Sequence, residues 1–248
     1  MTRWHIPSVA LFASYAIPIV TFVTTFVIAM NTPRLHEPFD GMVMWVYHGD
    51  YHLSTSISHG LSRRIGCLGL SLSALVFLFV VLNKIAYMHY HLKNYHAEEL
   101  KLRESLLWWL QMTGISSSVF MIFVCSFPES EGLVMHLICA LLYFGSNMAY
   151  QYLYLKVDEV FSLHTQEPIL HRLRQSCFIV SLCCLCGVVV SLVGFDNMTI
   201  SSGLEIVMAV FMLAFYCSLH SQYSNINIHS YIIAVDHQNV HEIIKKNE

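Results

Sequence analysis

Charged residues are scarce in this sequence. Lysine, arginine, aspartate and glutamate make up 12% of the 248 residues, whereas 56% are hydrophobic. Soluble domains carry about a quarter charged residues, so this balance lies outside their usual range. We therefore expect the lipid bilayer to be the main partner of the chain. The net charge of -3, with no basic stripe interleaved with aromatic residues, argues against a nucleic acid partner.

The usual signatures of catalysis and of metal binding are also missing. The sequence has no Gly-x-Ser-x-Gly elbow, no His-Glu-x-x-His pair and no glycine-rich phosphate loop. Its eight cysteines all lie within or at the ends of apolar runs, and none falls in the long polar segment 31–64. A disulfide-stapled extracellular domain is therefore excluded. We predict a protein that is not an enzyme, with no cofactor and no bound metal.

Long apolar runs dominate what is present, and the clearest pair lies between Ser105 and Lys156. Residues 106–127 and 133–155 form two runs, joined by the short acidic hinge 128–132. Each run has about the 20 residues that a helix needs to cross about 30 Å of hydrocarbon. This stretch is predicted to be a transmembrane hairpin.

Four further apolar runs complete the predicted fold, at 9–30, 65–82, 177–195 and 202–219. Backbone groups in lipid must be satisfied within the segment, so continuous runs of this length indicate helices. The predicted fold is all-α: a polytopic membrane protein whose residues 1–248 form one bundle of six transmembrane helices.

The basic residues predict the orientation. With six spans both termini lie on one side, and ten of the 13 lysines and arginines fall on that side, whereas Arg34, Arg63 and Arg64 fall on the other. Basic residues concentrate on the cytoplasmic side of membrane proteins. Both termini and the tail 221–248 are therefore predicted to be cytoplasmic, and 31–64 to be a long lumenal loop. The cytoplasmic segments 85–104 and 156–174 and the tail are candidate surfaces for protein partners.

A layer of polar residues is predicted where the spans reach the lumen. Its members are Arg63, Arg64, Glu131, His136 and Glu205. Ionisable groups at membrane depth are costly and tend to face the interior of a bundle or a cavity, which favours a functional role. The alternative is that they reach water and only terminate helices. A further hypothesis concerns the histidines of the 31–64 loop, which would gain charge in an acidic compartment.

Two regions of the sequence are similar to a known protein family. The first region comprises Gly114, Phe127, the acidic hinge, His136, Gly145 and Tyr150, and the second comprises segment 205–216 followed by Gln222-Tyr223-Ser224. These residues resemble the third, fourth and last spans of the damage-regulated autophagy modulator (DRAM) family. The first lumenal loop departs from the family: its Tyr-Ile-Ser-Asp-Thr-Gly-type motif is only loosely matched by residues 47–55.

The resemblance implies a multi-pass protein of lysosomal or endosomal membranes that promotes or regulates autophagy, and by extension apoptosis, without catalysis. The wider superfamily includes plasma-membrane adaptors of a phosphoinositide kinase and a Golgi-type factor that remodels GPI-anchor lipids. The plasma membrane and the Golgi or endoplasmic reticulum are therefore alternative locations. Two alternative functions stay open: a transporter or channel for a small solute, and a lipid-modifying or GPI-anchor-remodelling membrane factor.

Overall fold

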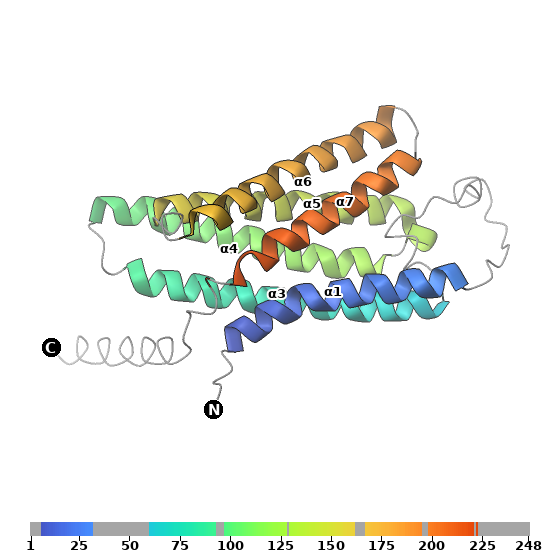
Figure 1. Ribbon diagram of the computed structural model, residues 1–248, viewed down its shortest axis with the longest axis horizontal. Coiled ribbons are helices and arrows are strands. Elements are labelled where there is room, and N and C mark those ends of the chain that lie inside the picture. Colours follow the sequence, from blue (N-terminus) through green and yellow to red (C-terminus); the bar gives the residue numbers. More distant parts are fainter. Residues whose placement is uncertain are drawn as a thin grey trace.

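The computed structural model describes residues 6–31, 60–92, 97–127, 129–161, 167–194, 198–220 and 222. These residues form six α-helices (Figure 1): α1 (Ile6–Asn31), α3 (Gly60–Leu92), α4 (Ala97–Ser126), α5 (Glu129–Val160), α6 (Pro168–Gly194) and α7 (Met198–Cys217). Most of the predicted lumenal loop 31–64 and all but the start of the tail 221–248 lie outside the described residues.

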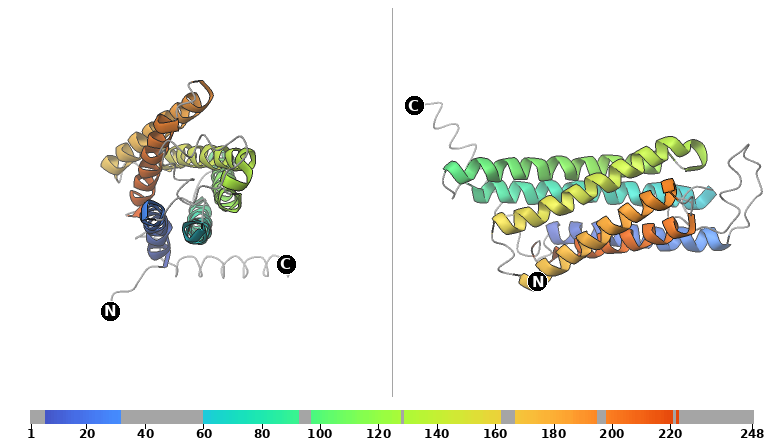
Figure 2. Two further views of the ribbon diagram at one scale, coloured as in Figure 1. Left: turned by 90° about the vertical axis from the view of Figure 1, so that its right-hand side faces the viewer. Right: turned by 90° about the horizontal axis from the view of Figure 1, so that it is seen from above.

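The helices alternate in direction along the long axis of the molecule (Figures 1 and 2). Each helix packs against the helix before it and the helix after it in the chain, and α7 returns to contact α1. The six helices thus form a ring. We call the end where α1 begins and α7 ends the termini end, and the opposite end, where α3 and α7 begin, the far end.

Five of the described helices are long and apolar enough to cross a membrane. The segments are Ser8–Ile28, Gly60–Ala86, Leu102–Ser126, Gly132–Val160 and Pro168–Ser191, and α7 adds the shorter apolar stretch Gly203–Cys217. This result matches the predicted all-α polytopic character. The 20 residues of α7 extend about 30 Å, the thickness of the hydrocarbon layer. A crossing by α7 and a cytoplasmic position of the termini stay predictions.

At the termini end the helices extend beyond the predicted spans. Helix α4 begins at Ala97, and its first turns are rich in Glu, Leu, Lys and Arg, which favour a helix even in water. Helix α6 begins at Pro168, a residue suited to the first position of a helix because its missing N–H has no partner there. Asp158 and Arg174, which belong to the predicted cytoplasmic segment 156–174, therefore both lie in helices.

Hydrophobic side chains cover the outside of the ring as well as its interior. Five of the outward-facing side chains are more than half exposed: Val20, Leu68, Val134, Ile179 and Val210. Monomeric soluble proteins rarely expose contiguous apolar surface on this scale. A lipid bilayer satisfies such a surface, in agreement with the predicted bilayer partner.

The crossing of α1 and α3 yields a testable prediction at Gly69. A Cβ atom added at Gly69 would lie 3.0 Å from Cβ of Thr21 and 2.8 Å from its Cγ2. Rotation of the Thr21 side chain moves Cγ2 but not Cβ, so Gly69→Ala must push the two helices apart. We expect Gly69→Ala to lower the unfolding free energy of the purified protein by about 1–3 kcal/mol.

Gly145→Ala is the matched control. Gly145 lies on the exposed side of α5, and a Cβ atom added there meets nothing within 4 Å. Alanine is the better helix former by about 1 kcal/mol, so this variant should be neutral or stabilising. Thermal unfolding in detergent measures both variants, and equal stability of the two would contradict the close contact of α1 with α3.

Candidate functional site

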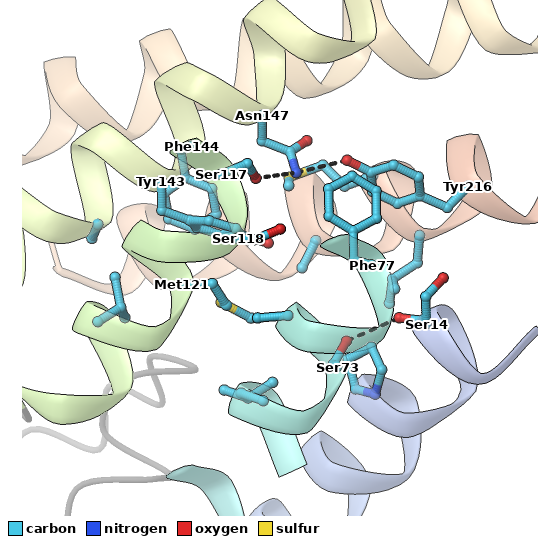
Figure 3. A pocket seen from close by; sticks show the side chains of 18 of the residues that line it. Ser14, Ser73, Phe77, Ser117, Ser118, Met121, Tyr143, Phe144, Asn147 and Tyr216 are labelled. Carbon is cyan, nitrogen blue, oxygen red and sulfur yellow. Dashed lines mark hydrogen bonds between the residues drawn. The ribbon is translucent and has the colours of Figure 1, made fainter. Parts of the chain in front are cut away.

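A partly open cavity lies at the centre of the ring, between α1, α3, α4, α5 and α7 (Figure 3). About 100 Å³ of it is available to the centres of water-sized molecules. Because one water needs about 10–15 Å³ by this measure, several waters or a small organic molecule fit. The polar lining residues are Ser14, Ser73, Ser117, Ser118, His136, Asn147, Glu205 and Tyr216. The others are Tyr143, whose ring carries a hydroxyl group, and the apolar residues Pro18, Phe22, Leu70, Ala74, Phe77, Met121, Val124, Ala140, Phe144, Ala209, Met212 and Leu213.

Two members of the predicted polar layer, His136 and Glu205, line this cavity together. Arg63 is partly buried and Arg64 is exposed, both in the first turns of α3 at the far end, and neither lines the cavity. Glu131 belongs to the first turn of α5, and its side chain lies outside the described part of the structure. The structure therefore brings two of the five candidate residues to one cavity.

His136 is buried and held by a hydrogen bond to the backbone. Its Nδ1 lies 2.8 Å from the backbone carbonyl oxygen of Phe127, at the end of α4. A carbonyl oxygen only accepts hydrogen bonds, so Nδ1 must carry the proton of this bond. In the neutral ring, Nε2 is then a hydrogen-bond acceptor. The bond also ties the end of α4 to α5.

Three of the four serines that line the cavity donate their hydroxyl protons to backbone carbonyls. Ser14 donates to the carbonyl of Leu11 at 2.7 Å, and Ser73 donates to the carbonyl of Ser14 at 3.0 Å, which links α3 to α1. Ser118 donates to the carbonyl of Gly114 at 3.1 Å. Each hydroxyl oxygen keeps lone pairs that can accept a hydrogen bond.

Asn147 joins three helices at the side of the cavity (Figure 3). Its amide donates to Oγ of Ser117 on α4 at 3.2 Å and to the hydroxyl of Tyr216 on α7 at 2.7 Å. Its own carbonyl accepts from Nε2 of Gln151 at 2.9 Å. All four side chains belong to buried residues. Such polar contacts between helices stabilise membrane bundles by about 1 kcal/mol each.

A second polar cluster lies at the termini end; we call it the termini-end cluster and define it as Lys84, Asp158, Glu167, His171, Arg174 and Gln222. Arg174 and Asp158 have side chains that are both 0% exposed, and Nη1 of Arg174 lies 2.7 Å from Oδ2 of Asp158. Nη2 of Arg174 contacts Glu167 at 3.0 Å. The same guanidinium donates to Oγ of Ser218 at 3.2 Å and to its carbonyl at 2.8 Å, so Arg174 ties α6 to α5 and to the exit of α7.

Gln222 extends this cluster to α3. Its amide donates to Oδ1 of Asp158 at 3.3 Å. Its carbonyl accepts from the hydroxyl of Tyr154 at 2.6 Å and from Nζ of Lys84 at 3.3 Å. Side chains from α3, α5, α6 and the residues after α7 thus interlock at the termini end of the bundle.

The sequence prediction missed the termini-end cluster, although one part of it is visible in the sequence. Four polar residues of α5 follow one another at spacings of about one helical turn and therefore share one face of the helix: Asn147, Gln151, Tyr154 and Asp158. A polar stripe in an apolar helix favours a partner inside the bundle. The sequence contains no comparable signal for the partners Arg174 and Gln222.

Among the described residues, no group of three or more His, Cys, Asp or Glu side chains could hold a metal ion. The histidines of the predicted lumenal loop between 32 and 59 fall outside the described residues.

Comparisons with protein-family models, with curated proteins and with solved structures found no match to this chain.

Proposed function

We propose that this chain is a non-enzymatic multi-pass protein of lysosomal or endosomal membranes that regulates autophagy and, through it, cell death. We further propose that its central cavity binds a small amphipathic molecule. The cellular role rests on the resemblance of α4, α5 and α7 to the DRAM family. The binding role rests on the cavity.

The observation that carries the binding role is the composition of the cavity wall. Apolar side chains form most of it, and a few polar groups, among them His136 and Glu205, are set into it. Small-molecule sites have this composition: apolar surface supplies affinity, and a few placed polar groups fix the orientation. Ionisable groups inside a membrane bundle favour function over stability, because their burial is costly.

The termini end supplies the surfaces proposed for cytoplasmic protein partners. Helices α3 and α4 continue past their apolar segments, which end at Ala86 and begin at Leu102. Leu102 and Glu104 are exposed there. These extensions fall within the predicted partner surface 85–104.

The proposed cellular role can be tested by measuring where the protein is located in the cell and how its deletion affects autophagic flux. An internally tagged full-length chain is expected to co-localise with lysosomal or endosomal markers in live cells, and deletion of the gene is expected to change the turnover of autophagosomes. A protein found wholly on the plasma membrane, with flux unchanged by deletion, would contradict the proposal.

A transporter is the second candidate, and the position of Glu205 in the cavity favours it. The interlocked termini-end cluster would then act as the closed side of a permeation path. We expect Glu205→Gln to lower solute flux into liposomes that contain the purified chain by about tenfold, because the negative charge that attracts the solute is lost. Absence of flux for a broad panel of solutes would count against a transporter.

A further inference from the structure

We propose that the central cavity is a site for an amine with an apolar tail, whose protonated ammonium group is bound beside Glu205. This inference rests on the proposed binding role and names the chemical class of the ligand. It follows from the hydrogen-bonding inventory of the wall, from its charge and from its shape.

The cavity wall has more acceptors to offer than donors. The hydroxyl protons of Ser14, Ser73 and Ser118 are used on backbone carbonyls, and both amide protons of Asn147 are used on Ser117 and Tyr216. The Nδ1 proton of His136 is used on a carbonyl as well.

After these bonds are made, the three serine oxygens still have lone pairs that can accept a hydrogen bond from a ligand. When the His136 ring is neutral, its Nε2 can accept one as well. The hydroxyl protons of Ser117, Tyr143 and Tyr216 are the donors that these bonds do not use. A ligand that donates several hydrogen bonds therefore fits better than one that accepts them, and an ammonium group donates up to three.

The charge of the wall selects a cation. Among the described lining residues Glu205 is the carboxylate, none is a lysine or an arginine, and His136 is the basic group. A carboxylate offers about four acceptor sites, so Glu205 has the capacity to accept hydrogen bonds from a ligand in addition to its contacts within the protein. Bringing an ammonium group into a largely apolar bundle is costly unless it is paired, and Glu205 supplies the pair. An anionic headgroup would meet repulsion instead.

The shape of the wall selects an organic amine over a metal ion. Phe22, Phe77 and Phe144 present aromatic rings to the cavity, and an ammonium group is attracted to the face of such rings. Glu205 and Tyr216 line the cavity 11 residues apart on α7, which corresponds to about 16 Å along the helix. This length accommodates an alkyl tail along the apolar wall, whereas a hard metal ion would require about six oxygen ligands.

Four octyl compounds that differ only in the headgroup test the proposal. The full-length chain is placed in phosphatidylcholine nanodiscs, and binding of radiolabelled octylamine is measured after subtraction of binding to empty nanodiscs. Octanol, octanoate and octyltrimethylammonium are used as competitors. We expect octylamine to bind about tenfold more tightly than octanol, and octanoate to compete least.

Each alternative ranking overturns the proposal in a distinct way. Equal affinity of octanol and octylamine would show that the positive charge is not recognised. Equal affinity of octyltrimethylammonium, which has no N–H group, would show that the acceptors of the wall are not used. Ala140 lines the cavity, so Ala140→Phe fills it. If none of the four compounds binds and Ala140→Phe leaves autophagic flux unchanged, the proposed binding role itself fails.

The variant Glu205→Gln tests whether the ammonium group of octylamine is bound beside Glu205. This variant keeps the shape of the side chain and removes its charge, so octylamine should lose about tenfold in affinity while octanol is unaffected. Glu159→Gln is the control, because Glu159 is partly exposed at the termini end and pairs with Lys156. Thermal unfolding of both variants establishes that they are folded. Unchanged octylamine affinity in a folded Glu205→Gln variant would overturn the assignment.

Discussion

Replacing Arg174 with methionine is expected to lower the unfolding free energy of the protein by about 3–5 kcal/mol, the largest effect on stability predicted for any single change considered. Arg174 and Asp158 are fully buried, and the guanidinium binds two carboxylates and the exit of α7 at once. Without the guanidinium, the buried carboxylate of Asp158 loses the positive charge that lies 2.7 Å from it, and removing one partner is the costly change for a buried pair. Chemical unfolding of the purified protein in detergent measures the loss.

Arg172→Met is the control for this prediction. Arg172 is exposed in the same helix, two residues before Arg174. Surface changes of this kind usually alter stability by less than about 0.5 kcal/mol. The double variant Asp158→Asn with Arg174→Met should recover part of the loss, because the fully buried carboxylate is then removed together with the guanidinium, and the carboxylate that stays, Glu167, is 22% exposed. A single Arg174→Met variant as stable as Arg172→Met would contradict a buried ion pair.

Filling the cavity with Ala140→Phe is expected to abolish ligand binding and to reduce autophagic flux to the level of deletion cells. Ala140 lines the cavity from α5, so a phenyl ring there occupies space that the ligand needs. We expect octylamine affinity to fall by more than about tenfold, with the location of the tagged protein unchanged. Radioligand binding in nanodiscs and flux in complemented deletion cells are the two measurements.

Leu141→Phe separates blockage from general damage to α5. Leu141 is the next residue, is 52% exposed and therefore faces away from the cavity. This variant should bind octylamine and support flux as the unmodified chain does. Ala209→Phe fills the cavity from α7 and provides a second blocking variant if Ala140→Phe does not fold. A folded blocking variant with full ligand affinity would place the ligand elsewhere.

Much of the architecture was predictable from the sequence, because hydropathy and helix length are local properties. The predicted spans 9–30, 65–82, 106–127 and 133–155 each lie within or close to one described helix, since lipid requires every backbone group to be satisfied within the segment. The predicted ends of the spans were less accurate at the termini end. There α4 begins at Ala97, before the apolar run, because residues such as Ala97 and Glu98 are strong helix formers.

The candidate site was predictable only in part. The cost of an ionisable group in an apolar run singled out His136 and Glu205, and both line the cavity. The same criterion also selected Arg63 and Arg64, which belong to the first turns of α3 and do not line it. A polar residue near the end of a span can turn toward water or toward the bundle, and hydropathy alone does not distinguish these directions.

The sequence by itself determined that the chain is a set of apolar helices suited to a bilayer, because each helix satisfies its own backbone. Only the tertiary structure decided which polar groups meet. Lys84 and Gln222 are separated by 138 residues, and Arg174 and Ser218 by 44. The cavity likewise draws its wall from five helices. Such contacts depend on how helices are ordered and rotated around the ring, and those are properties of packing between segments rather than of any one segment.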